Sequence, residues 1–248
     1  MRTMGIDEKE PRAGHASFRS MLAQARQTRE TVKQQRVLET DSIRDHGQPY
    51  DVFNRDVGVY LASLEEFFPG VSKHVKDIID KKHHRGQKVL VVDLAGAASA
   101  SSLGADKTIS ATLQNNVQPV GAQTLLAVDI LSNQGQQTLL RTIRGTGMQI
   151  SFLFLRPVGP AASPNYAGNA YVDRKMARLL TEVYRLHAPG GEMYLDFNYV
   201  FRKLEIPHAF EGLQATIEDA SKDGPLERNI FRITKPEVPE QPIEKLES

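Results

Sequence analysis

The stretch Lys88-Val-Leu-Val-Val-Asp-Leu-Ala-Gly-Ala-Ala-Ser99 decides the fold class of this chain. Residues 89–94 are apolar except for Asp93, as in parallel strands that are buried on both faces. A turn of small residues follows, and Gly96 is its one glycine. Small residues let backbone amides approach a ligand closely, but a tight strand-to-helix turn also needs them for packing. The stretch therefore predicts a buried strand that ends in a ligand-binding turn or in a packing turn.

Helices and strands alternate around this stretch. Apolar spacing predicts helices over residues 56–68, 72–85, 101–115, 134–144 and 173–188. Further strands are predicted over residues 124–131, 149–155, 192–197 and 229–234. Ser72 and Asp173 are expected to cap two of the helices, and Pro189-Gly-Gly191 is expected to end the last one. The alternation predicts an α/β fold with a doubly wound, mostly parallel sheet.

The ends of the chain differ in composition from this central part. Residues 1–47 are predicted to form a disordered N-terminus and a helical extension, with a weakly amphipathic helix from Ser17 to about Arg36. Residues 48–234 form the predicted α/β domain, and residues 235–248 a disordered tail rich in Pro and Glu. The N-terminal helix is the expected contact for a protein partner or for self-association.

Composition excludes several classes of function. The chain has 248 residues, a net charge of +1 and no cysteine, which excludes disulfides, cysteine nucleophiles and iron–sulfur clusters. No apolar run is long enough for a membrane span and no signal peptide is seen, so we expect a cytoplasmic protein. No metal site is expected, because His83 and His84 are adjacent and do not face one point on a helix. Nothing in the net charge predicts a nucleic-acid partner, and the basic run 81–88 is expected to be a solvated helix end.

The predicted strands place polar residues at one edge of the sheet. Ligands of such sheets bind outside the carboxyl ends of the strands, where Asp93, Gly96, Asp129 and the loop after Leu155 are expected. Asp129 closes the predicted second strand, and its carboxylate could accept both hydroxyls of a ribose or cap the next helix. The chain lacks G-x-G-x-x-G and the phosphate-loop pattern, which ranks NAD and FAD below other adenosine ligands.

Several segments resemble class I S-adenosylmethionine-dependent methyltransferases, which have a Rossmann-like fold. Residues 89–96 resemble the family's first motif, and the sequence Asp-Leu-Ala-Gly within them is similar to that motif in the quinone-biosynthesis branch. Residues 126–131 resemble the second motif, whose acid holds the ribose. Residues 177–195 resemble the helix, Pro-Gly-Gly turn and strand that follow the active-site strand, and Tyr50–Asn54 resembles a segment that folds over the cofactor. The resemblance covers roughly residues 48–234.

The resemblance implies a methyltransferase that uses S-adenosylmethionine and methylates a small molecule or a protein. The residues that it implies for cofactor binding are Asp93, Ala95, Gly96, Ala97, Asp129, Ile130, Tyr50 and Asn54. The loop 156–172 is expected to form a substrate wall with Arg156, Tyr166 and Tyr171. No catalytic residue is assigned; Asp196, Tyr199 and His187 are candidates for a general base by location only.

The chain departs from the family pattern at three points, and the first two favour an alternative function. The family has glycine where this chain has Ala97 and Ser99, and often at Ala95, and an alanine resists positive φ. The active-site strand ends in Arg156, where the family has an acid or Asn, and an arginine beside a sulfonium is unfavourable unless it faces an anionic substrate. The two acids are also 36 positions apart, further than in the dinucleotide fingerprint. The alternative is a catalytically inactive, methyltransferase-like binding or regulatory protein.

Overall fold

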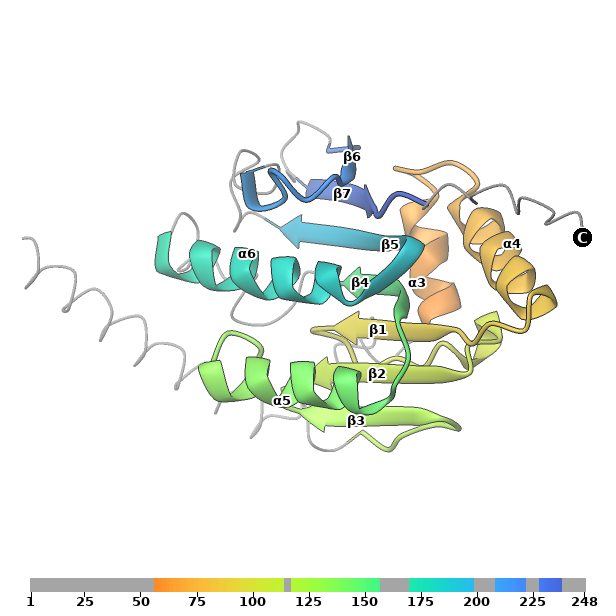
Figure 1. The fold of residues 1–248 in the computed structure, drawn as a ribbon, viewed down its shortest axis with the longest axis horizontal. Helices are drawn as coiled ribbons and strands as arrows, with labels where there is room; N and C mark the ends of the chain where they lie inside the picture. Colours follow the sequence, from red (N-terminus) through yellow and green to blue (C-terminus); the bar gives the residue numbers. More distant parts are fainter. Residues whose placement is uncertain (1–55, 114–116, 157–169, 199–207, 222–227, 238–248) are drawn as a thin grey trace, which may run out of the picture. The chain divides into compact units, whose positions relative to one another are not determined.

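The computed structural model describes residues 56–113, 117–156, 170–198, 208–221 and 228–237 (Figure 1). The chain divides into two compact units, Met1–Leu38 and Glu39–Ser248, and every described residue belongs to the second. The predicted N-terminal helix lies outside the described residues. The division of the chain into residues 1–47, 48–234 and 235–248 stays a prediction.

The described residues form one seven-stranded sheet in the order β3-β2-β1-β4-β5-β7-β6. The strands are β1 (Leu90–Leu94), β2 (Lys107–Thr112), β3 (Gln123–Ala127), β4 (Ile150–Leu155), β5 (His187–Asn198), β6 (Thr216–Asp219) and β7 (Arg228–Thr234). Strands β1 to β5 run parallel, as their arrows in Figure 1 show, and β7 runs antiparallel to β5 and β6. The predicted doubly wound, mostly parallel sheet is confirmed.

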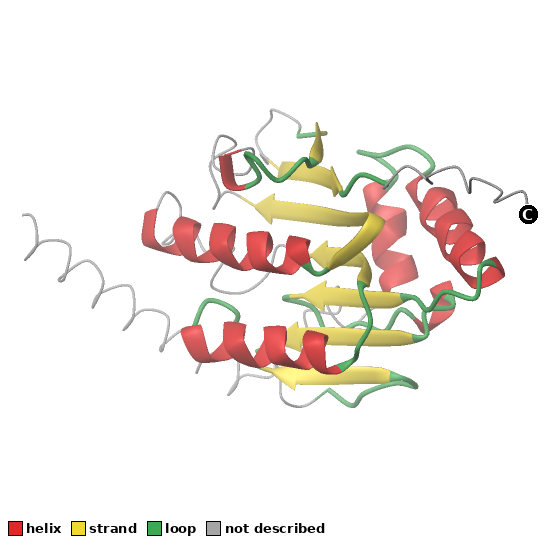
Figure 2. Cartoon of the chain, in the orientation of Figure 1, coloured by secondary structure: helices red, strands yellow, loops and turns green. Residues whose placement is uncertain are grey.

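Helices cover both faces of this sheet (Figures 1 and 2). Helices α5 (Asn133–Gly145) and α6 (Ala170–Arg185) lie on one face, and α3 (Val57–Leu64) lies on the other, packed against α4 (Val71–His84). On the α3 side, one buried core joins α3 and α4 to β1, β4, β5 and β7; its members include Leu61, Val75, Val91, Phe154 and Ile230. No described helix is both long and apolar enough to cross a bilayer.

The first two helices form where the apolar spacing predicts them, but the second has a different cap. Asp56 caps α3 by accepting a hydrogen bond from the Gly58 N–H at 2.7 Å. α4 begins at Val71, after Gly70 in a left-handed conformation, so the predicted Ser72 cap is wrong. The carboxylate of Glu65 replaces it, because it accepts hydrogen bonds from the backbone N–H groups of Gly70 and Ser72. A side chain from the preceding turn thus satisfies the helix start.

The prediction of a helix over residues 101–115 is wrong, because Lys107–Thr112 of this segment form an additional strand. Only Ser101–Leu103 form a short 3-10 turn, and β2 follows at once, paired in parallel with β1. Serines and glycine weaken a helix here, whereas the Thr-Ile-Ser-Ala-Thr run of 108–112 suits a pleated, buried strand. The predicted second strand is therefore β3. An extra strand lies between Asp93 and Asp129, which explains their long separation in sequence.

The last helix and the strand after it also begin earlier than predicted. α6 starts at Ala170, so Asp173 lies inside the helix and does not cap it. β5 starts at His187 and includes Pro189-Gly-Gly191, which was predicted to end the helix. The pairing of β4 with β5 shifts between Ile150 and Phe152, so that Ile150 pairs with His187 and Phe152 with Glu192. This bulge accommodates the proline and the two glycines within the strand.

Candidate active site

Charged side chains end the α3-facing rows of three adjacent central strands. Side chains alternate between the two faces of a strand, so Asp93 follows Val91 on one face, Arg156 follows Phe154, and Asp196 follows Tyr194. Asp93 is in register with Phe154, and Phe154 with Tyr194. All three charged residues are buried. The carboxyl edge of the sheet therefore carries an acidic, a basic and an acidic side chain beneath α3.

Asp93 and Arg156 form a fully buried ion pair. The Arg156 Nε–H donates to Asp93 Oδ1 at 2.8 Å, and neither side chain is exposed. Asp93 Oδ2 accepts a second hydrogen bond from the Ala98 N–H at 2.9 Å. Burial raises the pKa of Asp93 above its ordinary value, while the Arg156 charge and these hydrogen bonds oppose the rise. The carboxylate thus points into the protein and holds the turn that follows β1.

Helix α3 covers this pair from above the sheet. The Arg156 Cζ lies 4.5 Å from the centre of the Tyr60 ring, within the range of a cation–π contact. The Tyr60 hydroxyl donates to Asp196 Oδ2 at 3.4 Å. One residue of α3 therefore links the charges at the ends of β4 and β5. The Arg156 side chain is thus buried against Asp93 and Tyr60, and its predicted role in a substrate wall stays a prediction.

The turn after β1 has one position that only glycine fits. A Cβ on Gly96 would lie 2.4 Å from Asp93 Oδ2, which is too close for any side chain. Ala95 has a φ of +56°, a conformation that non-glycine residues adopt rarely and at some cost. Ala97 and Ala98 are buried. The turn therefore forms a close backbone bend. Alanine occupies position 97, where the methyltransferases that the sequence resembles have glycine, and position 95, where they often have it.

Polar side chains of β2 and β3 bind the same turn. The Gln123 side-chain amide donates to the Ala97 carbonyl at 3.0 Å, and the Ser110 hydroxyl donates to the Ala98 carbonyl at 2.9 Å. Gln123 also donates to Ser110 Oγ at 2.9 Å, so the contacts form a buried network. Sequence reasoning missed Ser110, because residues 101–115 were predicted as a helix, and it missed Gln123, because the predicted strand starts one residue later at 124. A buried serine within an apolar strand is the signal that points to such a role.

Asp129 lies at the same edge of the sheet, two strands away from β1. It follows β3, and its Oδ1 accepts a hydrogen bond from the Leu131 N–H at 2.9 Å. Ser132 caps α5, so the alternative role of Asp129 as a helix cap is wrong. Ile130 beside it is buried. The strand adjacent to β1 ends instead in Thr112, which carries no charge.

Only some of the predicted site residues lie close together in the structure. Asp93, Ala95, Gly96, Ala97 and Arg156 lie together, and Asp129 and Ile130 lie further along the edge. Tyr50, Asn54, Tyr166 and Tyr199 lie outside the described residues, and of Tyr171 only the helical backbone is described. His187 begins β5 and so lies at the opposite, amino-terminal edge. Within the described ranges, no group of three or more His, Asp or Glu residues could hold a metal ion.

Comparisons with known proteins find likeness in structure but not in sequence. No family model and no curated protein matches the sequence. A candidate S-adenosylmethionine-dependent methyltransferase from Streptococcus mutans is similar at 11% identity and a TM-score of 0.41, over 58% of this chain and 44% of that one. SMU.776, a candidate methyltransferase complexed with SAH, has 12% identity and a TM-score of 0.40. That match covers 63% of this chain and 49% of SMU.776.

A third similar structure is that of SAM-bound CalS10, an amino pentose methyltransferase from Micromonospora echinaspora. It has 12% identity and a TM-score of 0.38, and the match covers 66% of this chain and 90% of CalS10. This chain thus spans less than half of the first two proteins and most of the third. The fold assignment rests on the strand order of the chain itself.

Proposed function

We propose that the protein is an S-adenosylmethionine-dependent methyltransferase whose cofactor lies at the carboxyl edge of the sheet, from the turn 95–98 toward Asp129. One observation carries the proposal: the Asp93 carboxylate fixes a close backbone turn beside the point where the strand order reverses, between β1 and β4. Ligands of doubly wound sheets bind at this point. The proposed acceptor is a small molecule or a protein, and the proposed location is the cytoplasm.

The residues of the turn have distinct roles in this proposal. Asp93 is a positioning residue, because both of its oxygens are engaged inside the protein and neither can contact a ligand. Gly96 lets the backbone bend tightly over that carboxylate. Arg156 does not repel a sulfonium as a lone charge would, because Asp93 neutralises it.

Asp129 and Ile130 serve the far end of the cofactor in this proposal. The Asp129 carboxylate is partly exposed and could accept the ribose hydroxyls, and Ile130 offers an apolar contact beside it. The bound cofactor supplies the activated methyl group. The chain contributes proximity and orientation, which can be worth about 7–11 kcal/mol in such a displacement.

A second candidate function is favoured by the same turn. Alanine side chains fill it, and Thr112 stands at the end of β2 where an acid next to β1 would be expected to bind a ribose. These features suit a protein that keeps the methyltransferase fold and uses it to bind a partner. It would bind no S-adenosylmethionine.

Calorimetric titration with S-adenosylmethionine and S-adenosylhomocysteine tests the two functions. We expect saturable binding of both, and at 100 times Kd a gain of about 2.7 kcal/mol in unfolding free energy. Asp129→Ala should weaken binding about tenfold or more, which corresponds to roughly 1.4 kcal/mol. Asp77→Ala is the matched control, because Asp77 is an exposed aspartate on α4 that pairs with Lys73.

The outcomes separate the alternatives. No heat and no stabilisation from either ligand at about 1 mM would exclude the methyltransferase and leave the binding protein. Binding that Asp129→Ala does not change would remove Asp129 from the site while keeping the cofactor. Binding weakened equally by Asp77→Ala would show a general effect of charge instead of a contact.

A further inference from the structure

A cavity of about 690 Å³ lies at the amino-terminal edge of the sheet, opposite the turn 95–98. It is bounded by the last turn of α4, by the residues just before β1 and β4, and by the first residues of β5. Figure 1 shows this edge on the right, where the arrows of the parallel strands begin. Small-molecule pockets have volumes of roughly 300–1,000 Å³. The cavity is large enough for a ligand and separate from the proposed methyltransferase site.

Positive charge dominates the lining of this cavity. Lys81, Lys82 and Arg85 come from the end of α4, and Lys88 comes from just before β1. Glu237 is the one carboxylate among the described residues that line it. Cations at the end of a helix are favourable because the last carbonyls carry partial negative charge. The sequence analysis predicts that the basic run 81–88 is only a solvated helix end. In the structure, four cations of this run line a concave surface.

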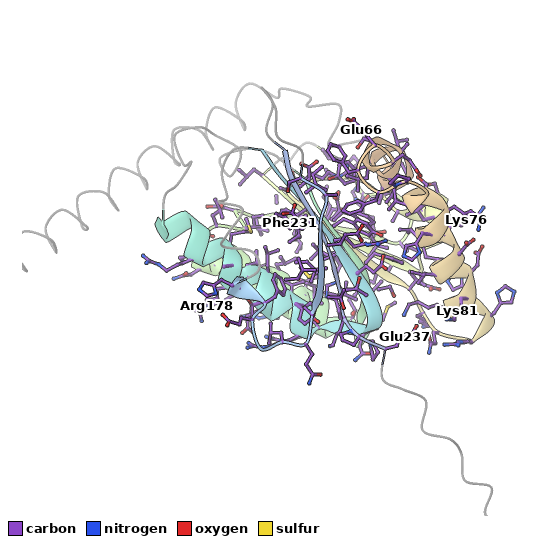
Figure 3. All side chains as sticks on the ribbon, turned by 90° about the horizontal axis from the view of Figure 1, so that it is seen from above. Glu66, Lys76, Lys81, Arg178, Phe231 and Glu237 are labelled. Carbon is purple, nitrogen blue, oxygen red and sulfur yellow. The ribbon has the colours of Figure 1, made fainter. Side chains whose placement is uncertain are left out.

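Glu237 is a largely exposed counter-ion beside the lysines of the cavity. Its Oε1 lies 3.9 Å from Lys81 Nζ, and Figure 3 shows these two residues on the same side of the molecule. Its side chain covers Gly190, where an added Cβ would lie 3.1 Å from Glu237 Cγ. Partial burial lowers the pKa of Lys82, and the Glu237 charge opposes this effect. One carboxylate thus faces several cations, one of which has lost part of its hydration.

The remaining lining includes apolar side chains. Ile78, Met148 and Pro189 contribute apolar surface beside the lysines. A lysine ammonium is a compact charge on a flexible chain and binds phosphate without the planar geometry that a carboxylate–arginine pair needs. Apolar side chains can cover a sugar or a ring. We propose that this cavity binds a phosphate-bearing small molecule of about nucleotide size, whose phosphates displace Glu237 from the lysines.

Calorimetric titration of the full chain with inorganic tripolyphosphate and with ADP tests this proposal. We expect saturable binding of both probes, and Lys82→Gln should weaken it about tenfold through the loss of one close charge. Lys76→Gln is the matched control, since Lys76 is an exposed lysine of the same helix outside the cavity lining (Figure 3). Glu237→Gln should tighten binding several-fold, because it removes the competing carboxylate.

Further variants and a competition experiment distinguish this cavity from other binding sites. Asp129→Ala should leave tripolyphosphate binding unchanged, and Lys82→Gln should leave the binding of S-adenosylmethionine unchanged, so each site can fail alone. The proposal is overturned if tripolyphosphate does not bind at about 1 mM, or if Lys76→Gln weakens binding as much as Lys82→Gln. It is also overturned if a short single-stranded RNA binds at this surface and tripolyphosphate does not compete with it.

Discussion

Replacing Arg156 with methionine should lower the free energy of unfolding by about 3–5 kcal/mol, because it leaves the Asp93 carboxylate buried without its partner. Methionine keeps much of the side-chain length, so the loss reports on the charge more than on a cavity. Without the Arg156 charge, burial would raise the pKa of Asp93 further, opposed only by the Ala98 N–H among the contacts described for it. The loss of stability should therefore shrink as the pH falls and the carboxyl group becomes neutral. Urea unfolding at several pH values measures both effects.

Two further variants show whether pairing is the cause. In the double variant Asp93→Asn/Arg156→Met the position of Asp93 carries no charge that has lost its partner, so most of the lost stability should return. Arg185→Met is the control, because Arg185 pairs with Glu182 on the exposed face of α6 and should cost at most about 1 kcal/mol. A loss for Arg156→Met no larger than that of Arg185→Met would contradict the proposed role of the ion pair.

The parts of the fold that local patterns encode were predictable. α3 and α5 have their apolar residues at helical spacing, and β1 and β4 are short apolar runs, so each element is visible within its own segment. β2 was not predictable in this way. Its Thr-Ile-Ser-Ala-Thr sequence has weak hydrophobicity, and it becomes a strand because it pairs with β1 and buries Ile109 in the sheet.

The candidate site depends on contacts that no local pattern contains. Asp93 and Arg156 are 63 residues apart, and they meet only because β1 and β4 are adjacent and parallel with a fixed register. The sequence contained one usable signal: opposite charges, Asp93 and Arg156, stand at the ends of two predicted strands that are otherwise apolar. Reading those two ends together would have predicted the buried ion pair of Asp93 with Arg156.

A fall in pH from 7 to 4 should remove a stabilising contribution of His187. His187 is fully buried at the start of β5, and burial lowers its pKa to about 4. The contact of Nδ1 with the Val183 carbonyl opposes this shift, whereas the charges of Lys235 and Lys82 add to it. In the unfolded chain the histidine has an ordinary pKa near 6.5. Between these two values the unfolded chain takes up a proton that the folded chain does not.

The sign of the effect follows from this difference. The contribution is complete above about pH 6.5, declines as the pH falls, and is lost once the pH has fallen through the folded pKa, for a total of about 3 kcal/mol. Urea unfolding between pH 7 and pH 4 measures the decline. The His187→Asn variant keeps a donor for the Val183 carbonyl but has no titrating group. Between pH 7 and pH 4 its free energy of unfolding should therefore fall by about 3 kcal/mol less than that of the unmodified protein.

His84 provides the matched control for this measurement. Its Nδ1 also contacts a carbonyl four residues earlier, that of Asp80, but the side chain is exposed. His84→Asn should therefore leave the pH dependence of stability as it is in the unmodified protein. Equal slopes for the unmodified protein and His187→Asn would mean that the buried imidazole takes up its proton as easily as in the unfolded chain. Within the described residues, Nε2 of His187 has no hydrogen-bond partner, and an uncompensated charge there is what the folded protein should resist.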